Sequence, residues 1–182
     1  MSSSGFPAFS FGIREAGLSI VGLCVLTLAA ALTLEHVGGF RPCPLCLEER
    51  YAHYASIPAA LIAVALARSA PIVSRVLLGL IAAAFVFNAG LSAFHAGVEW
   101  HWWAGPDSCS GVAPIATTPG DLMKSLASSG GIVRCDEAPL RILGISLAGY
   151  GALLSAFLAV LAAVASLGID PVGKFWGLLR GR

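Results

Sequence analysis

Four long apolar stretches divide this sequence and constrain its fold more than any other feature. They cover residues 16–34, 51–67, 76–94 and 142–167, and none has a charged residue in its interior. A helix needs ~20 residues to cross about 30 Å of hydrocarbon, and each stretch approaches that length. Pro58 predicts a kink or tilt in the second and shortest stretch. The sequence predicts an all-α, integral membrane four-helix bundle, with residues 1–182 forming a single transmembrane domain.

The overall composition supports a lipid bilayer as the surroundings and excludes nucleic acid as a partner. Hydrophobic residues make up 57% of the chain and charged residues only 12%, too few to cover the surface of a soluble domain of this length. The formal net charge is +1, and the sequence contains no Lys/Arg-rich tract that would bind phosphates.

The distribution of basic residues predicts the orientation in the membrane. We interpret residues 16–34 as an ordinary first helix, because their apolar run is longer than that of a signal peptide. Arg14, the turn with Arg68 and Arg75, and the basic C-terminal tail then share one side, which the positive-inside rule makes cytoplasmic. Two loops, about 35–49 and 95–139, face outward. Within the second loop, Pro119 to Ala127 is predicted to form a short helix lying flat on the bilayer.

The cysteines fall into two pairs, one in each outward loop. Cys43 and Cys46 form a Cys-Pro-Leu-Cys segment in the first loop, and Cys109 and Cys135 lie in the second. Only Cys24 lies inside a span, where we expect it to be inert packing. All four loop cysteines therefore face one compartment, an oxidising one in which disulfides persist.

A Cys-x-x-Cys segment is compatible with several chemistries. Haem attachment requires His directly after the second cysteine, and Leu47 stands there instead. A four-cysteine zinc site lacks a second close spacing, so we expect no metal centre. Two structural disulfides remain an alternative, although the short ring favours a redox-active dithiol.

The surroundings of the first pair favour the redox interpretation. Pro44 suits the first helical position, which makes Cys43 the N-cap and places Cys46 in the first turn. Free amides and the helix dipole stabilise a thiolate there. Arg50 follows Cys46 by four residues, on the same helical face, and is predicted to place a cation beside it.

Three segments of the chain resemble the DsbB family of disulfide-generating membrane proteins. They are residues 42–50, residues 94–100, and Cys135-Asp136-Glu137 ahead of Leu143-Gly144-Ile145-Ser146-Leu147, with Cys109 after Gly105-Pro106. The resemblance implies an enzyme of the bacterial inner membrane with its termini in the cytoplasm and its redox cysteines in the periplasm.

The resemblance also implies a role for each pair. Cys109 and Cys135 would reoxidise a periplasmic thiol oxidase resembling DsbA, and Cys43 and Cys46 would pass the electrons to a membrane quinone, either ubiquinone or menaquinone. Cys46 would lie next to the ring, Arg50 would hydrogen-bond a quinone oxygen, and His95 would lie near the same ring.

Two other functions remain open at this point. The vitamin K epoxide reductase family also couples thiols to quinones, but there the Cys-x-x-Cys follows the loop pair, whereas here it comes first. A non-catalytic membrane subunit with structural disulfides is the alternative from another class.

Among the remaining polar residues, Asn88 is expected to make an interhelical hydrogen bond, and Glu99 with Trp100, Trp102 and Trp103 to form an interfacial belt. His36, His53 and His101 are expected to be interfacial or solvated.

Overall fold

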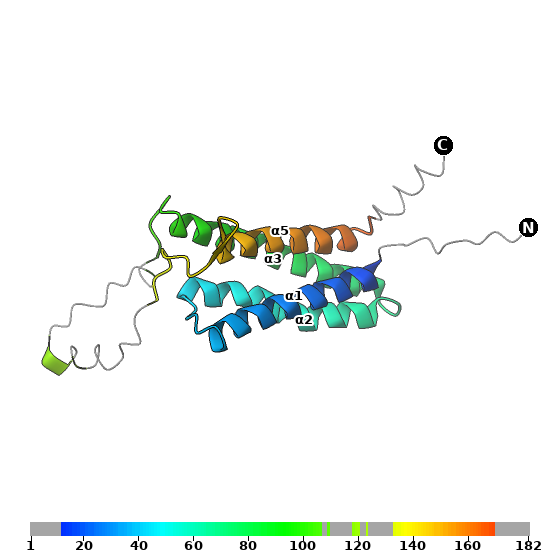
Figure 1. Ribbon diagram of the computed structural model, residues 1–182. Helices are drawn as coiled ribbons and strands as arrows, with labels where there is room; N and C mark the ends of the chain where they lie inside the picture. Colours follow the sequence, from blue (N-terminus) through cyan, green and yellow to red (C-terminus); the bar gives the residue numbers. More distant parts are fainter. Residues whose placement is uncertain (1–11, 107–108, 110–117, 121–122, 124–132, 170–182) are drawn as a thin grey trace, which may run out of the picture. The chain divides into compact units, whose positions relative to one another are not determined.

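Four long helices account for most of the chain in a computed structural model that describes residues 12–106, 109, 118–120, 123 and 133–169. They are α1 (Ile13–His36), α2 (Pro44–Leu66), α3 (Pro71–Glu99) and α5 (Leu147–Ser166), labelled in Figure 1. The helices coincide with the four apolar stretches, and the prediction of an all-α membrane bundle is confirmed.

Three of the described helices are long and apolar enough to cross a membrane: α1, α3 and α5. The helix α2 has a comparable length, 23 residues. However, Glu48, Glu49, Arg50 and His53 occupy its first turns and shorten its apolar part. The first cysteine pair lies at this polar beginning of α2, with Cys43 just before the helix and Cys46 in its first turn. The polar residues there follow the cysteines in the chain and shorten the apolar part of the helix.

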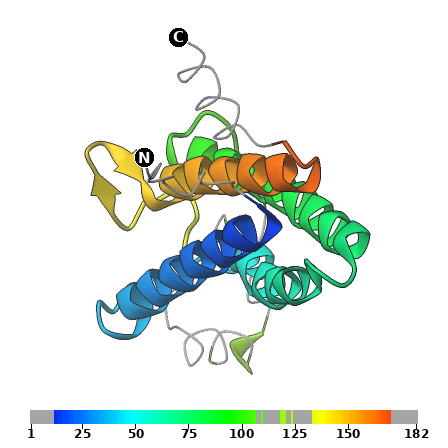
Figure 2. The same cartoon turned by 90° about the vertical axis from the view of Figure 1, so that its right-hand side faces the viewer.

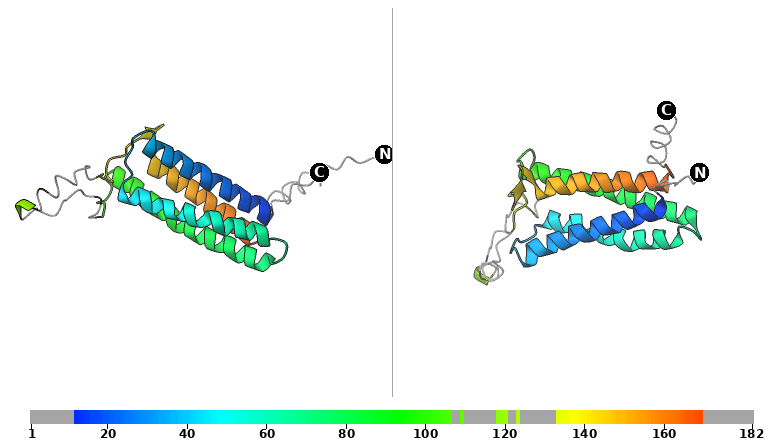
Figure 3. Two further views of the ribbon diagram at one scale, coloured as in Figure 1. Left: turned by 90° about the horizontal axis from the view of Figure 1, so that it is seen from below. Right: turned by 45° about the vertical axis from the view of Figure 1, so that its right-hand side comes forward.

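A two-stranded hairpin precedes α5, where the fourth apolar stretch predicted helix from residue 142. The strands β1 (Arg141–Ile142) and β2 (Ile145–Ser146) pair antiparallel. Figures 2 and 3 show them at the beginning of α5. Leu143 and Gly144, between them, both have positive φ, 51° and 82°, as a type I′ turn requires. The prediction was wrong here because the turn residue Leu143 is apolar and looks like part of a span.

Contacts divide the chain into two units, and each long helix contributes to both. The first unit comprises residues 1–28, 52–86 and 156–182. Within its described part, Gly17 of α1 lets α2 approach closely, because a Cβ at that position would lie 2.5 Å from Val64 Cγ2. His53 is buried, and the centroids of its ring and the Phe85 ring lie 5.2 Å apart in an edge-on arrangement. Of the two environments expected for His53, interfacial or solvated, the solvated one was wrong.

The second unit comprises residues 29–51 and 87–155 and contains all four loop cysteines. Asn88 Nδ2 of α3 donates to Ser155 Oγ of α5 at 2.9 Å, which confirms the predicted interhelical hydrogen bond. Most of the predicted short helix at 119–127 lies outside the described residues; Pro119, Gly120 and Met123 are helical. The prediction that this helix lies along the membrane remains untested.

Candidate functional site

The first cysteine pair sits at the N-terminus of α2. Cys43 immediately precedes the helix and Pro44 is its first residue, as the sequence predicts. The Cys46 backbone N–H donates to Cys43 Sγ at 3.2 Å, so the sulfur caps the helix in the way a serine oxygen would. Cys43 is only 3% exposed, whereas Cys46 is partly exposed. The pair is therefore held by helix geometry, with Cys46 the more accessible sulfur.

The two thiols of this pair differ in acidity. A hydrogen bond from the Cys46 side chain lowers the pKa of Cys43, and burial only partly opposes it. The same hydrogen bond raises the pKa of Cys46, and burial raises it further. In the dithiol form Cys43, the helix-capping sulfur, is therefore the first of the two thiols to ionise.

A histidine from α3 lies against this sulfur pair. His95 Nε2 is 3.5 Å from Cys43 Sγ, and His95 Nδ1 is 2.6 Å from Glu49 Oε1 of α2. An ionised carboxylate only accepts, so Nδ1 carries a proton, and Nε2 is the ring nitrogen that faces Cys43. The structure therefore brings the His95 side chain to the first cysteine pair.

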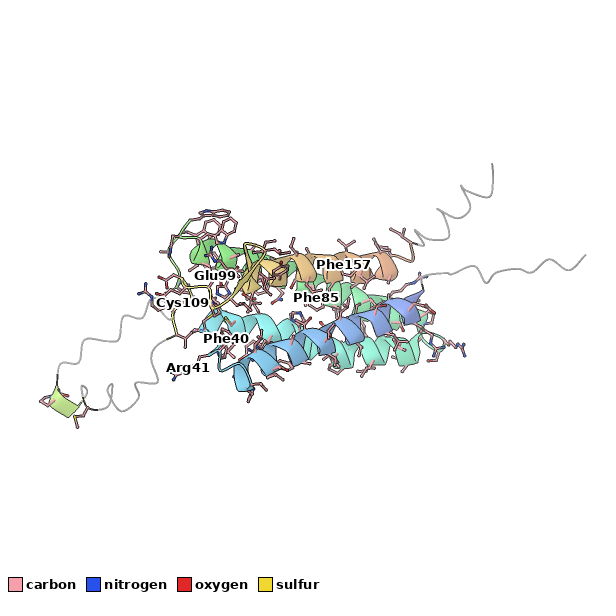
Figure 4. The ribbon with its side chains drawn as sticks, viewed as in Figure 1. Phe40, Arg41, Phe85, Glu99, Cys109 and Phe157 are labelled. Atoms are coloured by element: carbon pink, nitrogen blue, oxygen red, sulfur yellow. A yellow bond between two sulfur atoms is a disulfide. The ribbon has the colours of Figure 1, made fainter. Side chains whose placement is uncertain are left out.

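Glu99 adds a second carboxylate to the same place, one turn after His95. Its side chain is 2% exposed, and its Oε1 lies 3.9 Å from His95 Nε2. It hydrogen-bonds to Ser146 of β2, and Arg141 of β1 donates to its backbone oxygen at 3.2 Å. Glu99 therefore belongs to the site and not to an interfacial belt (Figure 4). The sequence analysis missed this role, although the i, i+4 spacing of Glu99 from His95 places both side chains on one face of α3.

Gly151 of α5 makes room for the Glu49 carboxylate. A Cβ at that position would lie 3.3 Å from Glu49 Oε2 and 3.4 Å from Ser92 Oγ, which is tighter than ordinary packing. Small residues let helices approach closely in membrane proteins. At Gly151, however, the atoms that lie close to the missing Cβ are the polar side-chain atoms Glu49 Oε2 and Ser92 Oγ, and not the backbone of another helix.

Arg50 pairs with an acid that the sequence analysis did not assign to it. Its Nη1 lies 2.6 Å from Glu35 Oε2, near the end of α1. Both side chains are largely buried, and the ion pair fixes the guanidinium one helical turn beyond Cys46. Glu35 therefore holds Arg50, and the placement of Arg50 beside Cys46 stays a prediction.

The second cysteine pair is a disulfide. Cys109 and Cys135 are bonded, with their Cα atoms 5.0 Å apart, and each is 1% exposed. The two residues share one buried cluster with Cys43, Leu45 and Val98, and Cys46 packs against that cluster. The fold therefore gathers both cysteine pairs, 63 residues apart at their nearest in the chain (Cys46 to Cys109), into a single core.

A pocket opens beside this disulfide. Its volume is about 390 Å³, and its lining includes Cys109, His101, Trp103, Arg134 and Asp136. Arg134 and Asp136 flank Cys135 in sequence and form a bidentate ion pair, with Nε 2.9 Å from Oδ1. That pair lowers the pKa of the partly exposed Asp136 carboxyl. Cys109, although only 1% exposed, is therefore one of the residues that line this pocket.

The chain matches the family model described as disulfide bond formation protein DsbB over residues 13–165. A disulfide bond formation protein B of Herminiimonas arsenicoxydans is 33% identical over 128 residues, covering 68% of this chain and 75% of that protein. A protein of the same description from Polaromonas sp. is 37% identical over 46% of this chain and 49% of its own length. An uncharacterised protein of Rickettsia prowazekii is 27% identical over 79% of this chain and 81% of its own. No solved structure matches the chain.

The family match covers all four helices and both cysteine pairs described above. This chain is therefore a multi-pass membrane protein that belongs to the DsbB family of disulfide bond formation proteins.

Proposed function

We propose that this protein reoxidises a soluble, DsbA-like dithiol oxidase of the periplasm and passes the electrons to a membrane quinone. The observation that carries the proposal is the shared cluster of Cys43, Cys109 and Cys135, with Cys46 packed against it. Purely structural disulfides have no need of a common core. Thiol–disulfide exchange between two pairs requires that their sulfurs meet.

Electrons enter at the loop disulfide. A thiolate of the donor attacks Cys109, whose side chain lines the pocket, and breaks the Cys109–Cys135 bond. Cys135 leaves as a thiol, and the second donor thiol then displaces Cys109. The donor gains a disulfide and the loop gains two thiols, so two electrons and two protons have moved.

The electrons then cross to the first pair. Cys135 attacks the Cys43 sulfur of an oxidised Cys43–Cys46 pair, and Cys46 leaves as a thiolate. In the dithiol form the hydrogen bond with Cys43 holds the pKa of Cys46 high. Once Cys43 is in a mixed disulfide it carries no negative charge, so the main cause of that rise is gone and Cys46 ionises more readily.

His95 and Glu49 handle the proton. His95 Nε2, 3.5 Å from Cys43 Sγ, is placed to accept the proton that a thiol loses as it forms a disulfide. Glu49 fixes the tautomer through Nδ1 and stabilises the imidazolium that results. Neither residue contacts the donor in this scheme.

The residues around Cys46 fit a quinone. Leu47 and Tyr51 of α2 are exposed and offer apolar surface next to the partly exposed Cys46. Arg50 has five N–H donors, of which the ion pair with Glu35 engages Nη1, so its fork suits a carbonyl oxygen that gains negative charge. A bound quinone supplies the acceptor for two electrons and two protons. Ubiquinone and menaquinone share the carbonyl groups on which this fit depends.

The proposal includes the bacterial inner membrane as the location, with both termini cytoplasmic and both cysteine loops periplasmic. The basic residues Arg14, Arg68 and Arg75 support this orientation. The donor and the loop disulfide then share the oxidising side, and a quinone dissolved in lipid reaches α2 from within the bilayer.

The direct test uses purified protein, a reduced DsbA-like oxidase and a soluble quinone analogue, with quinone absorbance as the readout. We expect one quinone reduced for each donor disulfide formed. Serine in place of any of the four loop cysteines should abolish turnover, and Cys24→Ser, the matched control, should leave it unchanged. Donor oxidation without quinone reduction would contradict the proposal.

A further inference from the structure

We infer that the reduced Cys43–Cys46 pair and His95 form a binding site for one soft, tetrahedral cation of the Zn²⁺ class. The two sulfurs and the histidine nitrogen all lie within 4.8 Å of one another. Bond lengths of about 2.3 Å to sulfur and 2.0–2.1 Å to nitrogen give a tetrahedral sulfur–nitrogen edge of about 3.5 Å. The observed distance from Cys43 Sγ to His95 Nε2 is 3.5 Å. Cys43 and His95 are therefore already at the spacing that the ion requires, and Cys46 Sγ lies within 4.8 Å of both ligand atoms.

The histidine is also oriented as a metal ligand. Glu49 accepts a hydrogen bond from His95 Nδ1 at 2.6 Å, which leaves Nε2 as the ring nitrogen that faces Cys43 Sγ, at 3.5 Å. Histidines that bind metals generally donate their other ring nitrogen to a carboxylate, which fixes the tautomer and raises ligand basicity. The Glu49–His95 pair thus supplies the outer shell of a zinc site before any ion binds.

The buried carboxylate of Glu99 is a second, independent observation that favours a cation at this site. Its carboxylate is 2% exposed, and its Oε2 has no hydrogen-bond partner among the described residues. Leaving a buried carboxylate oxygen unpaired is costly unless a cation compensates for it. Glu99 Oε1 lies 3.9 Å from His95 Nε2, so the carboxylate or a water can take the fourth position.

The site exists in only one redox state. Binding displaces the protons of both thiols to solvent and forms two sulfur–metal bonds, and no electrons are transferred. When Cys43 and Cys46 are joined as a disulfide, neither sulfur is a thiolate, and the site loses two of its ligands. If the proposed function holds, the ion is a reversible inhibitor of electron transfer to quinone. It binds the lone pairs of Cys43 Sγ and Cys46 Sγ, which these sulfurs need to be oxidised to a disulfide.

The test uses a variant in which Cys24, Cys109 and Cys135 are serine, so that Cys43 and Cys46 are the only thiols. Co²⁺ serves as the spectroscopic probe and Zn²⁺ as the competitor, in detergent-solubilised protein. We expect one Co²⁺ per chain in the reduced protein, with sulfur-to-cobalt charge-transfer bands that Zn²⁺ abolishes. The same sample with Cys43 and Cys46 oxidised is the matched control and should bind at least tenfold more weakly.

Two further variants test the histidine. His95→Ala should remove tight binding, and Glu49→Gln should weaken it roughly 10- to 100-fold. His36→Ala, which changes an exposed histidine of α1, should leave binding unchanged. Equal affinity in reduced and oxidised protein, or full affinity in His95→Ala, would overturn the inference. These readouts do not involve quinone, so a failure here is separable from a failure of the proposed electron transfer.

Discussion

At the scale of single residues, the local rules for a helix N-terminus predict the first cysteine pair but not its neighbours. Pro44 and the capping position of Cys43 follow from sequence alone. Glu49, His95 and Glu99 come from two helices, and their meeting depends on helix rotation that periodicity does not specify. Arg50 was expected beside Cys46 without a partner, whereas Glu35 holds it.

The unequal acidity of Cys43 and Cys46 is directly measurable. The Cys46 hydrogen bond lowers the pKa of Cys43, so its thiolate should persist below the pH of about 8.5 at which a free cysteine half-ionises. Cys46 should ionise only above that pH, since its pKa is raised. Alkylation rates across pH, followed for each cysteine by peptide mass spectrometry in chelator, check this order. Earlier ionisation of Cys46 would contradict the assignment of the capping thiolate.

Arg50→Ala should impair quinone use more than folding. Loss of a charge-assisted hydrogen bond costs ~1.5–3 kcal/mol, or roughly 10- to 150-fold in kcat/KM for quinone. Glu35→Gln is the matched control, since it breaks the same ion pair but keeps the guanidinium. Steady-state kinetics with varied quinone separate the two. An equal loss in both variants would mean that Arg50 acts only as the partner of Glu35.

At the scale of elements, hydrophobic length predicts helices well and fails where an apolar residue occupies a turn. The span beginning at residue 142 starts instead as a hairpin, since Leu143 adopts a positive φ. The Leu143 side chain is almost fully exposed, so it makes no core packing that a turn at this position would disrupt. Conversely, α2 is helical although its first turns are polar, because the caps and packing compensate for the missing hydrophobicity.

The end of α3 offers a matched pair of glycine substitutions. A Cβ at Gly97 would lie 2.0 Å from the ring of Trp103, which stacks on Phe94 and donates Nε1 to the Phe94 oxygen at 2.9 Å. Gly97→Ala should expel Trp103 and destabilise the protein by ~1–3 kcal/mol. Gly90→Ala meets nothing within 4 Å and should be neutral or stabilising. Thermal unfolding and tryptophan fluorescence in detergent check this, and equal effects of both would contradict the packing described.

At the scale of the whole molecule, the apolar stretches and cysteine positions indicate a membrane protein with two redox pairs before any coordinates are known. The resemblance implied the pairing of Cys109 with Cys135, and the structure has that disulfide. Their meeting with Cys43 could not be predicted, because it depends on how a long loop folds back onto the beginning of α2.

The orientation predicts the activity of reporter fusions. A reporter enzyme active only in the periplasm should be active when inserted in the loop of residues 95–139. It should be inactive when placed after Arg68 or at the C-terminus, because the basic residues hold those segments in the cytoplasm. Enzyme activity normalised to fusion abundance is the measurement. Activity at the C-terminus with none in the loop would reverse the orientation and remove the donor from the cysteines.

The central claim is that the two cysteine pairs form one electron relay, and a Cys46→Ser variant tests it most directly. Without Cys46, the Cys43 thiolate can attack Cys135 of the loop disulfide and release the Cys109 thiol. No thiol remains in the first pair to break the new bond, and acid quenching protonates Cys109 so that it cannot reverse the exchange. The account predicts a Cys43–Cys135 disulfide in non-reducing peptide maps of the acid-quenched variant, and its loss in Cys43→Ser/Cys46→Ser. Detection of Cys109–Cys135 alone, with wild-type protein still oxidising the donor, would contradict the relay.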